Sequence, residues 1–271
     1  MPTRIDWCDE SINPLGHWCF GPGGTKDNPK PCAYCYAKKM AARGMYCEKC
    51  KSFAKPHTHF EQLEKLAKWK RPKTIFIQSM GDLFHDEVPD EWIQEVFRAC
   101  EVAPQHRYLF LTKNPKRYKC NILHAMLNQY HKVYIHNLYI PPEETFGLHV
   151  LRKKADSYEY PKNMYFGTTI TRQYDANRRN YGLSSQMQGF LSLEPLQEKI
   201  TLEFDEKERI FIKWVIVGAE TGNRKDKITP KREWIENIVQ ACRGAGVPVF
   251  LKNNLADIWQ EPLIQQFPWE G

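Results

Sequence analysis

The sequence lacks any apolar run approaching the about 20 residues that a helix needs to span a bilayer, so we expect no membrane segment. Residues 1–7 contain no apolar stretch either, and we expect no secretory signal. An even, regular cysteine pattern is also missing. The nine cysteines are unevenly spaced, which argues against a disulfide framework and for a reducing compartment. These absences predict a soluble, cytoplasmic protein.

The composition permits a large hydrophobic core. The chain has 271 residues, 42% of them hydrophobic, which suffices for one α/β barrel. Its formal net charge is +7, with basic clusters at residues 65–73 and 172–179. Such clusters form either a solvated surface or a surface that attracts nucleic acid or phosphorylated substrates. Charge alone does not separate these two interpretations.

A helix-then-strand unit occurs twice in the chain. In each copy, Pro precedes a segment whose apolar residues fall at i, i+1, i+4, i+5 and i+8, which gives one helical stripe. The predicted helices cover residues 89–100 and 230–242, and Pro is tolerated in a first helical turn because its missing N–H would be unpaired there. Short hydrophobic strands follow at 108–111 and 249–251. They show the weak alternation typical of strands buried on both faces.

Strands that alternate with helices predict a parallel α/β sheet, and the length fits a TIM-type (β/α) barrel, complete or partial. Further apolar runs of the same kind lie at residues 74–77, 164–166, 190–193 and 214–217. We expect one domain over residues 1–271. Within it, residues 8–59 form an N-terminal cysteine loop, and residues 131–162 form an insertion at the mouth or side of the barrel.

Every predicted strand ends in polar or glycine-bearing residues. These exits begin at Gln78, Thr112, Gly167, Glu194, Gly218 and Lys252. The active sites of such barrels are assembled at the carboxyl ends of the parallel strands. Six exits of one character therefore predict a shared site, although any one of them could be an ordinary turn.

Three N-terminal cysteines are the strongest chemical signal. Cys32 and Cys35 form a Cys-x2-Cys pair, and Cys19 lies upstream across a loop rich in Gly and Pro. Thiolates bind soft metals and iron–sulfur clusters. Three protein ligands rather than four leave one coordination position open. A catalytic metal site needs such a position, whereas a structural site does not.

A second pair of thiols, Cys47 and Cys50, allows several interpretations. These two cysteines could complete a four-cysteine zinc site with Cys32 and Cys35. They could instead form a separate zinc site with two nearby histidines, His57 and His59. In the simplest alternative, Cys47 and Cys50 are free thiols. Cys100 and Cys242 lie on apolar helix stripes and are interpreted as core residues.

Cys32-Ala33-Tyr34-Cys35 resembles the end of the radical S-adenosylmethionine signature. In that superfamily three cysteines hold a 4Fe-4S cluster, S-adenosylmethionine chelates the fourth iron, and the aromatic residue, here Tyr34, flanks the cofactor. The usual signature has its first two cysteines closer together than Cys19 and Cys32, which twelve residues separate.

A broader resemblance covers most of the chain. It rests on residues 7–14, 32–37, 79–84, 104–106, 111–115, 194–196, 214–222 and 250–252. In order and character these motifs are similar to an uncharacterised bacteriophage-protein family, also found in bacteria and distantly related to radical S-adenosylmethionine enzymes. The insertion and the Cys47/Cys50 pair depart from the family pattern and inherit nothing from it.

The resemblance implies reductive cleavage of S-adenosylmethionine at the cluster, fed by an electron donor. The phage context and the positive charge together favour a nucleotide or nucleic acid as the substrate. The residues that it places around the cofactor are Ser79, Gly81, Asp82, Lys113, Thr168, Thr169, Arg172, Glu194, Glu220 and Lys252. Structural roles compete with this assignment, since Asp82 could cap a turn and each Lys could pair with a neighbouring Glu.

Two other classes of protein stay open. In the first, the chain is a zinc-binding, nucleic-acid-binding or interaction protein without catalytic activity, and its cysteines are structural. In the second, a degenerate barrel keeps the cluster but performs no chemistry.

Overall fold

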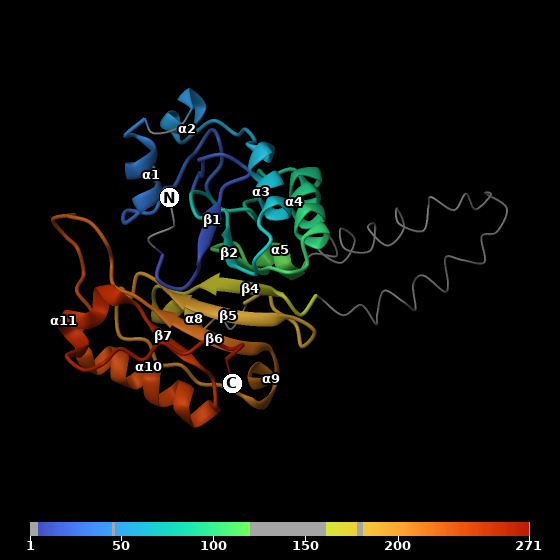
Figure 1. The fold of residues 1–271 in the computed structure, drawn as a ribbon. Helices are drawn as coiled ribbons and strands as arrows, with labels where there is room; N and C mark the ends of the chain where they lie inside the picture. The colour runs from blue at the N-terminus through green and yellow to red at the C-terminus, as the bar shows by residue number, and fades with distance from the viewer. Residues whose placement is uncertain (1–4, 45–46, 120–160, 178–180, 271) are drawn as a thin grey trace.

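The computed structural model describes residues 5–44, 47–119, 161–177 and 181–270. Its centre is a sheet of seven parallel strands in which neighbours along the chain are neighbours in space (Figure 1). The strands are β1 (Glu10–Ile12), β2 (Thr74–Ile77), β3 (Arg107–Thr112), β4 (Met164–Thr169), β5 (Gln188–Leu193), β6 (Ile212–Val217) and β7 (Val249–Leu251). The sheet curls into a half-barrel, so the expected α/β class and the partial barrel are confirmed. The predicted insertion at 131–162 lies almost wholly outside the described residues.

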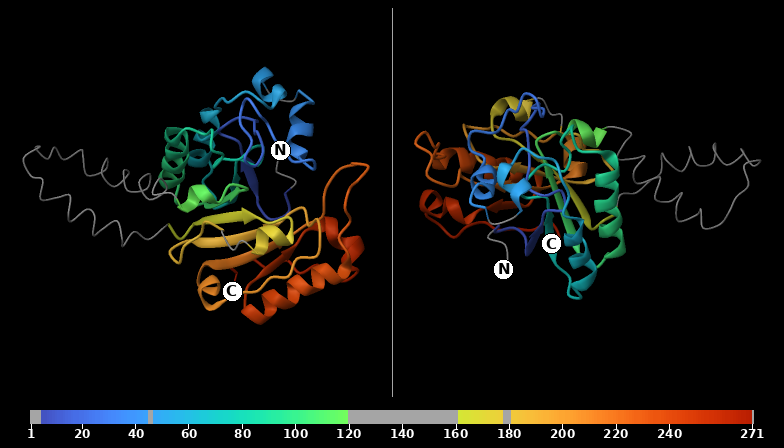
Figure 2. Two further views of the ribbon diagram at one scale, coloured as in Figure 1. Left: turned by 180° about the vertical axis from the view of Figure 1, so that it is seen from behind. Right: turned by 90° about the horizontal axis from the view of Figure 1, so that it is seen from above.

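Helices connect the strands and cover the outer face of the sheet (Figure 2). The α-helices are α1 (Tyr36–Ala41), α2 (Glu48–Ser52), α3 (Glu64–Lys68), α4 (Asp90–Val102), α5 (Lys116–Lys119), α8 (Gln173–Asn177), α9 (Glu206–Phe211), α10 (Arg232–Ala245) and α11 (Ala256–Trp259). Two 3-10 helices, η1 (Phe60–Gln62) and η2 (Asn253–Leu255), complete the described set.

The repeated unit folds as its periodicity predicts. Its two long helices are α4 and α10, and each buries the predicted stripe against the sheet. The buried residues are Ile93, Val96, Phe97 and Cys100 on α4, and Ile235, Ile238, Val239 and Cys242 on α10. Gly246 ends α10 in the left-handed conformation, with a φ of 67°, which glycine adopts without a Cβ penalty.

The concave side of the half-barrel is filled with aromatic side chains. The inner cluster comprises Trp7, Phe76, Leu109, Tyr165, Phe190, Trp214, Ile216 and Phe250. The C-terminal segment closes over this cluster, because Gln265 forms an antiparallel bridge to Phe250 and the Trp269 ring lies 5.3 Å from Tyr165. Packing on both faces explains why the strands show so little alternation.

Because the strands are parallel, their carboxyl ends lie at one rim of the half-barrel. The loops that carry the predicted site residues lie at the same rim. The loop after β1 carries Cys19, Cys32 and Cys35, and α1 begins directly after the last of them. The hydroxyl of Tyr36, in the first turn of α1, donates to the carbonyl of Ser79 in the loop after β2 at 2.5 Å. The cysteine loop therefore lies over the strand ends.

Candidate functional site

The loop between Cys19 and Cys32 folds back on itself. The N–H of Lys30 donates to the carbonyl of Phe20 at 2.6 Å, so the residues between them form a closed loop. Gly21 is needed at its base, with a φ of 81°, because a Cβ there would lie 1.8 Å from the carbonyl oxygen of Lys30. The closure brings Phe20 and Lys30, near the two ends of the loop, together.

The three thiols lie in one electrostatic neighbourhood. Burial raises the pKa of Cys19 to about 12, and the charges of Asp82, Cys32 and Cys35 add to that effect. Burial also raises the pKa of Cys35, while the N–H of Lys38 and the Lys113 ammonium oppose the increase. Cys19 and Cys35 pack against one hydrophobic cluster of Ala37, Ala41, Phe53 and Met80. A thiolate in such surroundings requires a positive partner, which a bound metal group supplies.

Tyr34 and Lys113 stand beside the cysteines. The Tyr34 hydroxyl is within hydrogen-bonding reach of Cys32 and Thr171. The Lys113 ammonium lies 6.0 Å from the centroid of the Tyr34 ring and donates to the Thr169 hydroxyl at 3.4 Å. The structure therefore brings together three of the predicted site residues, Tyr34 from the loop after β1, Lys113 from the loop after β3 and Thr169 from the end of β4.

The loop after β2 is braced rather than open. One oxygen of Asp82 accepts from the Thr112 hydroxyl at 2.7 Å, and the other accepts from the Lys113 N–H at 2.9 Å. A Cβ on Gly81 would lie 2.7 Å from the Trp18 carbonyl oxygen, so glycine is required. The Ser79 hydroxyl accepts from that of Ser11 at 2.6 Å. Asp82 therefore stabilises the turn after β2. This is the structural role that the sequence analysis gave as an alternative to cofactor binding.

A half-buried ion pair lies where β5 and β7 end. The Lys252 ammonium donates to Glu194, whose other oxygen accepts from the Trp7 indole N–H at 3.2 Å. Burial alone would lower the pKa of Lys252, but the adjacent Glu194 carboxylate raises it overall. Cys8 adjoins the pair, and burial raises the pKa of its thiol to about 12. The two predicted residues meet, and each is the other's principal partner.

Three further predicted residues point elsewhere. Glu220 is buried and accepts two hydrogen bonds from Arg224, at 2.8 and 2.9 Å, which hold its pKa below the usual range. The Thr168 hydroxyl donates to the Tyr181 carbonyl at 2.7 Å. The side chain of Arg172 is exposed. For Glu220 and Thr168, local partners already satisfy the polar groups that a cofactor would need.

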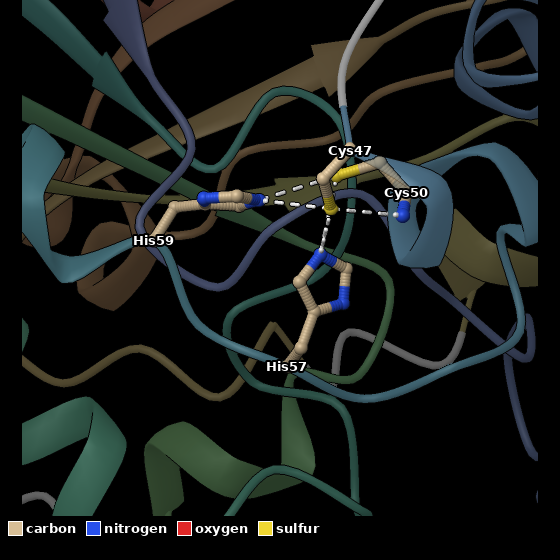
Figure 3. Close-up of side chains that lie close together, drawn as sticks. All are labelled: Cys47, Cys50, His57 and His59. Carbon is tan, nitrogen blue, oxygen red and sulfur yellow. Dashed lines mark hydrogen bonds between the residues drawn. The ribbon is translucent and has the colours of Figure 1, made fainter. Parts of the chain in front are cut away.

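The second pair of thiols forms a compact set with two histidines (Figure 3). All four ligand atoms of Cys47, Cys50, His57 and His59 lie within 4.8 Å of one another. The Cys47 sulfur is 3.4 Å from Nε2 of each histidine, and the Cys50 sulfur is 3.2 and 3.5 Å from the same two atoms. Tetrahedral zinc with bonds of about 2.3 Å to sulfur and about 2.0 Å to nitrogen separates such atoms by about 3.5 Å.

Outer contacts orient both histidines for binding through Nε2. Nδ1 of His57 lies 2.7 Å from the Lys55 carbonyl oxygen, and Nδ1 of His59 lies 2.9 Å from a Glu61 carboxylate oxygen. Such partners fix the tautomer that presents Nε2 to a metal. This Cys/His group could hold a metal ion such as zinc. Its composition favours the separate Cys2His2 set over the four-cysteine alternative with Cys32 and Cys35.

Sequence reasoning missed Gln78, the first residue after β2. It has a φ of 67°, which is rare outside glycine, and its side chain binds two backbone groups of the loop after β1. The side-chain oxygen accepts from the Leu15 N–H at 3.0 Å, and the amide donates to the Gly16 carbonyl at 2.7 Å. A polar residue directly after a buried strand was the available signal.

Comparison with known proteins places the chain in a family. A family model described as "Protein of unknown function (DUF5131)" matches residues 2–260, so the chain belongs to that family. No curated protein and no solved structure matches the chain. Among the described residues, none of the helices combines the length and the apolar character that crossing a bilayer requires.

Proposed function

We propose that this protein is an iron–sulfur enzyme of the radical S-adenosylmethionine type, with Cys19, Cys32 and Cys35 as the cluster ligands. The observation that supports the proposal is that the loop bearing Cys19, Cys32 and Cys35, three cysteines and not four, lies over the carboxyl ends of the parallel strands. The donor set fits, because three thiolates are the protein share of a cluster that leaves one iron for a cofactor. A bound and reduced cluster would supply an electron for the reductive cleavage of S-adenosylmethionine.

The chain's own residues supply binding, orientation and shielding from water. The Tyr34 ring, beside Lys113, would flank the cofactor. Lys113, which Thr169 orients, offers a cation for the methionine carboxylate. Glu194 is available to the amino group or the ribose hydroxyls if Lys252 shifts towards an anionic substrate. Asp82 holds the strand ends that place Lys113.

The proposed substrate class is a nucleotide or nucleic acid. The net charge of +7 favours an anionic partner. Lys113 and Lys252 are two cations at the same rim of the half-barrel, where the radical would form. Phosphate groups would be attracted to that rim over longer distances than neutral substrates.

The test is anaerobic reconstitution with iron and sulfide, followed by S-adenosylmethionine and dithionite. We expect visible cluster absorption that Cys32→Ala abolishes, and deoxyadenosine formation that depends on the wild-type cysteines. Cluster absorption without deoxyadenosine would favour a degenerate barrel that keeps the cluster and performs no chemistry.

A second candidate rests on the Cys2His2 set, whose distances suit zinc. In that case the metal is structural, and the positive charge binds nucleic acid without catalysis. Stoichiometric zinc with no iron after anaerobic purification, together with salt-sensitive binding of nucleic acid, would favour this candidate over the enzyme.

A further inference from the structure

The Cys2His2 set, Cys47, Cys50, His57 and His59, contacts the loop that carries Cys19. The backbone N–H of His17 donates to the Cys50 sulfur. The N–H of Cys19 donates at 3.4 Å to the carbonyl of Phe53, the C-cap residue of α2, three residues after Cys50. On the other side, the N–H of His59 donates to the Pro14 carbonyl at 2.7 Å. Residues 14–19, which we call the Cys19 segment, therefore lie along the metal set.

The packing between the two is close. Gly16 has a φ of 64°, and a Cβ at that position would lie 2.4 Å from Nε2 of His57. The backbone of the Cys19 segment thus rests directly on a ring that could bind the metal. Phe53, the C-cap residue of α2, belongs to the hydrophobic cluster against which Cys19 and Cys35 pack, so the end of α2 and two of the three thiols proposed for the iron–sulfur cluster share one cluster.

Gln78 binds the backbone of Leu15 and Gly16, and Leu15 and Trp18 are buried in the core, but α2 and the metal set on the other side of the Cys19 segment have few contacts of their own. Helix α2 has five residues, far below the length at which a helix is stable without tertiary support. Its only buried residue within the helix is Cys50. Segments of this size commonly depend on metal binding for their folded structure, because the free energy of binding becomes free energy of folding.

We propose that Cys47, Cys50, His57 and His59 bind a structural zinc ion whose role is to hold the Cys19 segment, and so to place Cys19 beside Cys32 and Cys35. The placement of a cluster ligand rests on the proposed function, whereas the zinc site and its grip on the segment do not.

The test compares the full-length wild type with two glycine variants that have the same backbone requirement. Gly16 and Gly23 have φ values of 64° and 65°, but a Cβ on Gly23 would meet nothing within 4 Å. Gly16→Ala and Gly23→Ala therefore add similar backbone strain, and only the first also forces a side chain into His57. His59→Ala, which removes a ligand, is the third variant.

Two readouts separate the parts of the proposal. Zinc content and zinc affinity are measured on protein purified with zinc, and amide hydrogen exchange is measured over the Cys19 segment, with α10 as an internal reference. We expect about one zinc per chain in the wild type and in Gly23→Ala. We expect a zinc affinity at least about tenfold weaker in Gly16→Ala, and loss of zinc in His59→Ala. The rate of exchange at the Cys19 N–H should rise about tenfold or more in both Gly16→Ala and His59→Ala, while the exchange rates in α10 stay unchanged.

Iron content after anaerobic reconstitution then tests the link to the cluster. If wild type binds iron, both zinc-site variants should bind several-fold less. Full iron in a zinc-free variant, unchanged exchange at Cys19, or wild type without zinc would overturn the proposal. If wild type binds zinc but no iron, the proposed function fails, and the exchange data alone decide whether zinc holds the segment. Should His59→Ala not fold, removing zinc from wild type with a chelator and restoring it gives the same exchange comparison.

Discussion

The two groups of cysteines differ in how complete they are. The Cys2His2 set brings four ligand atoms to tetrahedral spacing from one short stretch of chain, with outer contacts already fixing both rings. The three thiols Cys19, Cys32 and Cys35 come from a longer loop that also carries Tyr34, whose ring lies near Lys113 at the end of β3. A closed set suits a structural ion, and an open set beside polar groups suits a cofactor that takes part in chemistry.

The largest expected effect is an asymmetric loss of metal from the two groups. Cys32→Ala should lose its iron while it keeps zinc, whereas Cys50→Ser should lose zinc and, because zinc holds the Cys19 segment, should also bind several-fold less iron. Each change removes one ligand of one site and leaves the other site's ligands intact. Metal analysis of the anaerobically reconstituted proteins measures both, with Cys242→Ala as a control cysteine buried on α10. Loss of both metals in Cys32→Ala would mean that the two groups are not separate sites.

The next effect distinguishes the two lysines at the rim. Lys113→Met should weaken S-adenosylmethionine binding about tenfold, because it removes a charge-assisted contact, and should change stability little. Lys252→Met leaves the half-buried Glu194 carboxylate without its cationic partner, so we expect this change to lower the free energy of unfolding by about 2 kcal/mol. Calorimetric titration and urea unfolding measure the two effects. Equal losses of stability in the two variants would contradict the separate roles.

A smaller effect concerns the outer contacts of the closed set. Glu61→Gln weakens the hydrogen bond that orients His59, so zinc affinity should fall about tenfold. Competition with a chromophoric chelator measures that affinity. Iron content should stay at the wild-type level, because zinc still fills the weakened site at ordinary concentrations and so still holds the Cys19 segment. An unchanged zinc affinity would show that Glu61 does not support the ligand.

The smallest effect is at Glu220, which Arg224 already satisfies. Glu220→Gln should lower the free energy of unfolding by about 1 kcal/mol at pH 7 and leave metal content unchanged. Arg224 lowers the folded-state pKa of Glu220, so its stabilisation is present above the unfolded value of about 4.3 and is lost as the pH falls through the folded value. The gap between the two proteins should therefore close below about pH 4. A gap independent of pH in urea unfolding would contradict the ion pair.

Much of the fold follows from local pattern. The stripes on α4 and α10 repeat at helical spacing, and the six predicted strands fall within β2 to β7. Strand β1 was missed because Glu10-Ser11-Ile12 is short and mostly polar, and only pairing with β2 makes it a strand. The tail that closes the inner cluster was missed for the same reason, since its contacts are tertiary.

The site was predictable where ligands are close in sequence. Spacing alone suggested the pair Cys47/Cys50 with its histidines, as one of several alternatives. The partner of Asp82 was not predictable in this way, because Thr112 reaches it only through the fold, whereas Arg224, the main partner of Glu220, lies four residues along the chain. The loop between Cys19 and Cys32 is closed by a backbone hydrogen bond between Phe20 and Lys30, which the spacing of the cysteines does not predict.

The most direct test of the open site is electron paramagnetic resonance of the reconstituted protein, reduced with dithionite and recorded with and without S-adenosylmethionine. If three cysteines hold a cluster with one iron free of protein ligands, we expect a reduced-cluster signal that changes when S-adenosylmethionine binds. Cys50→Ser, examined in parallel, reports how far the zinc site supports that signal. A wild-type protein with no cluster signal, or with a signal that S-adenosylmethionine leaves unchanged, would contradict the account.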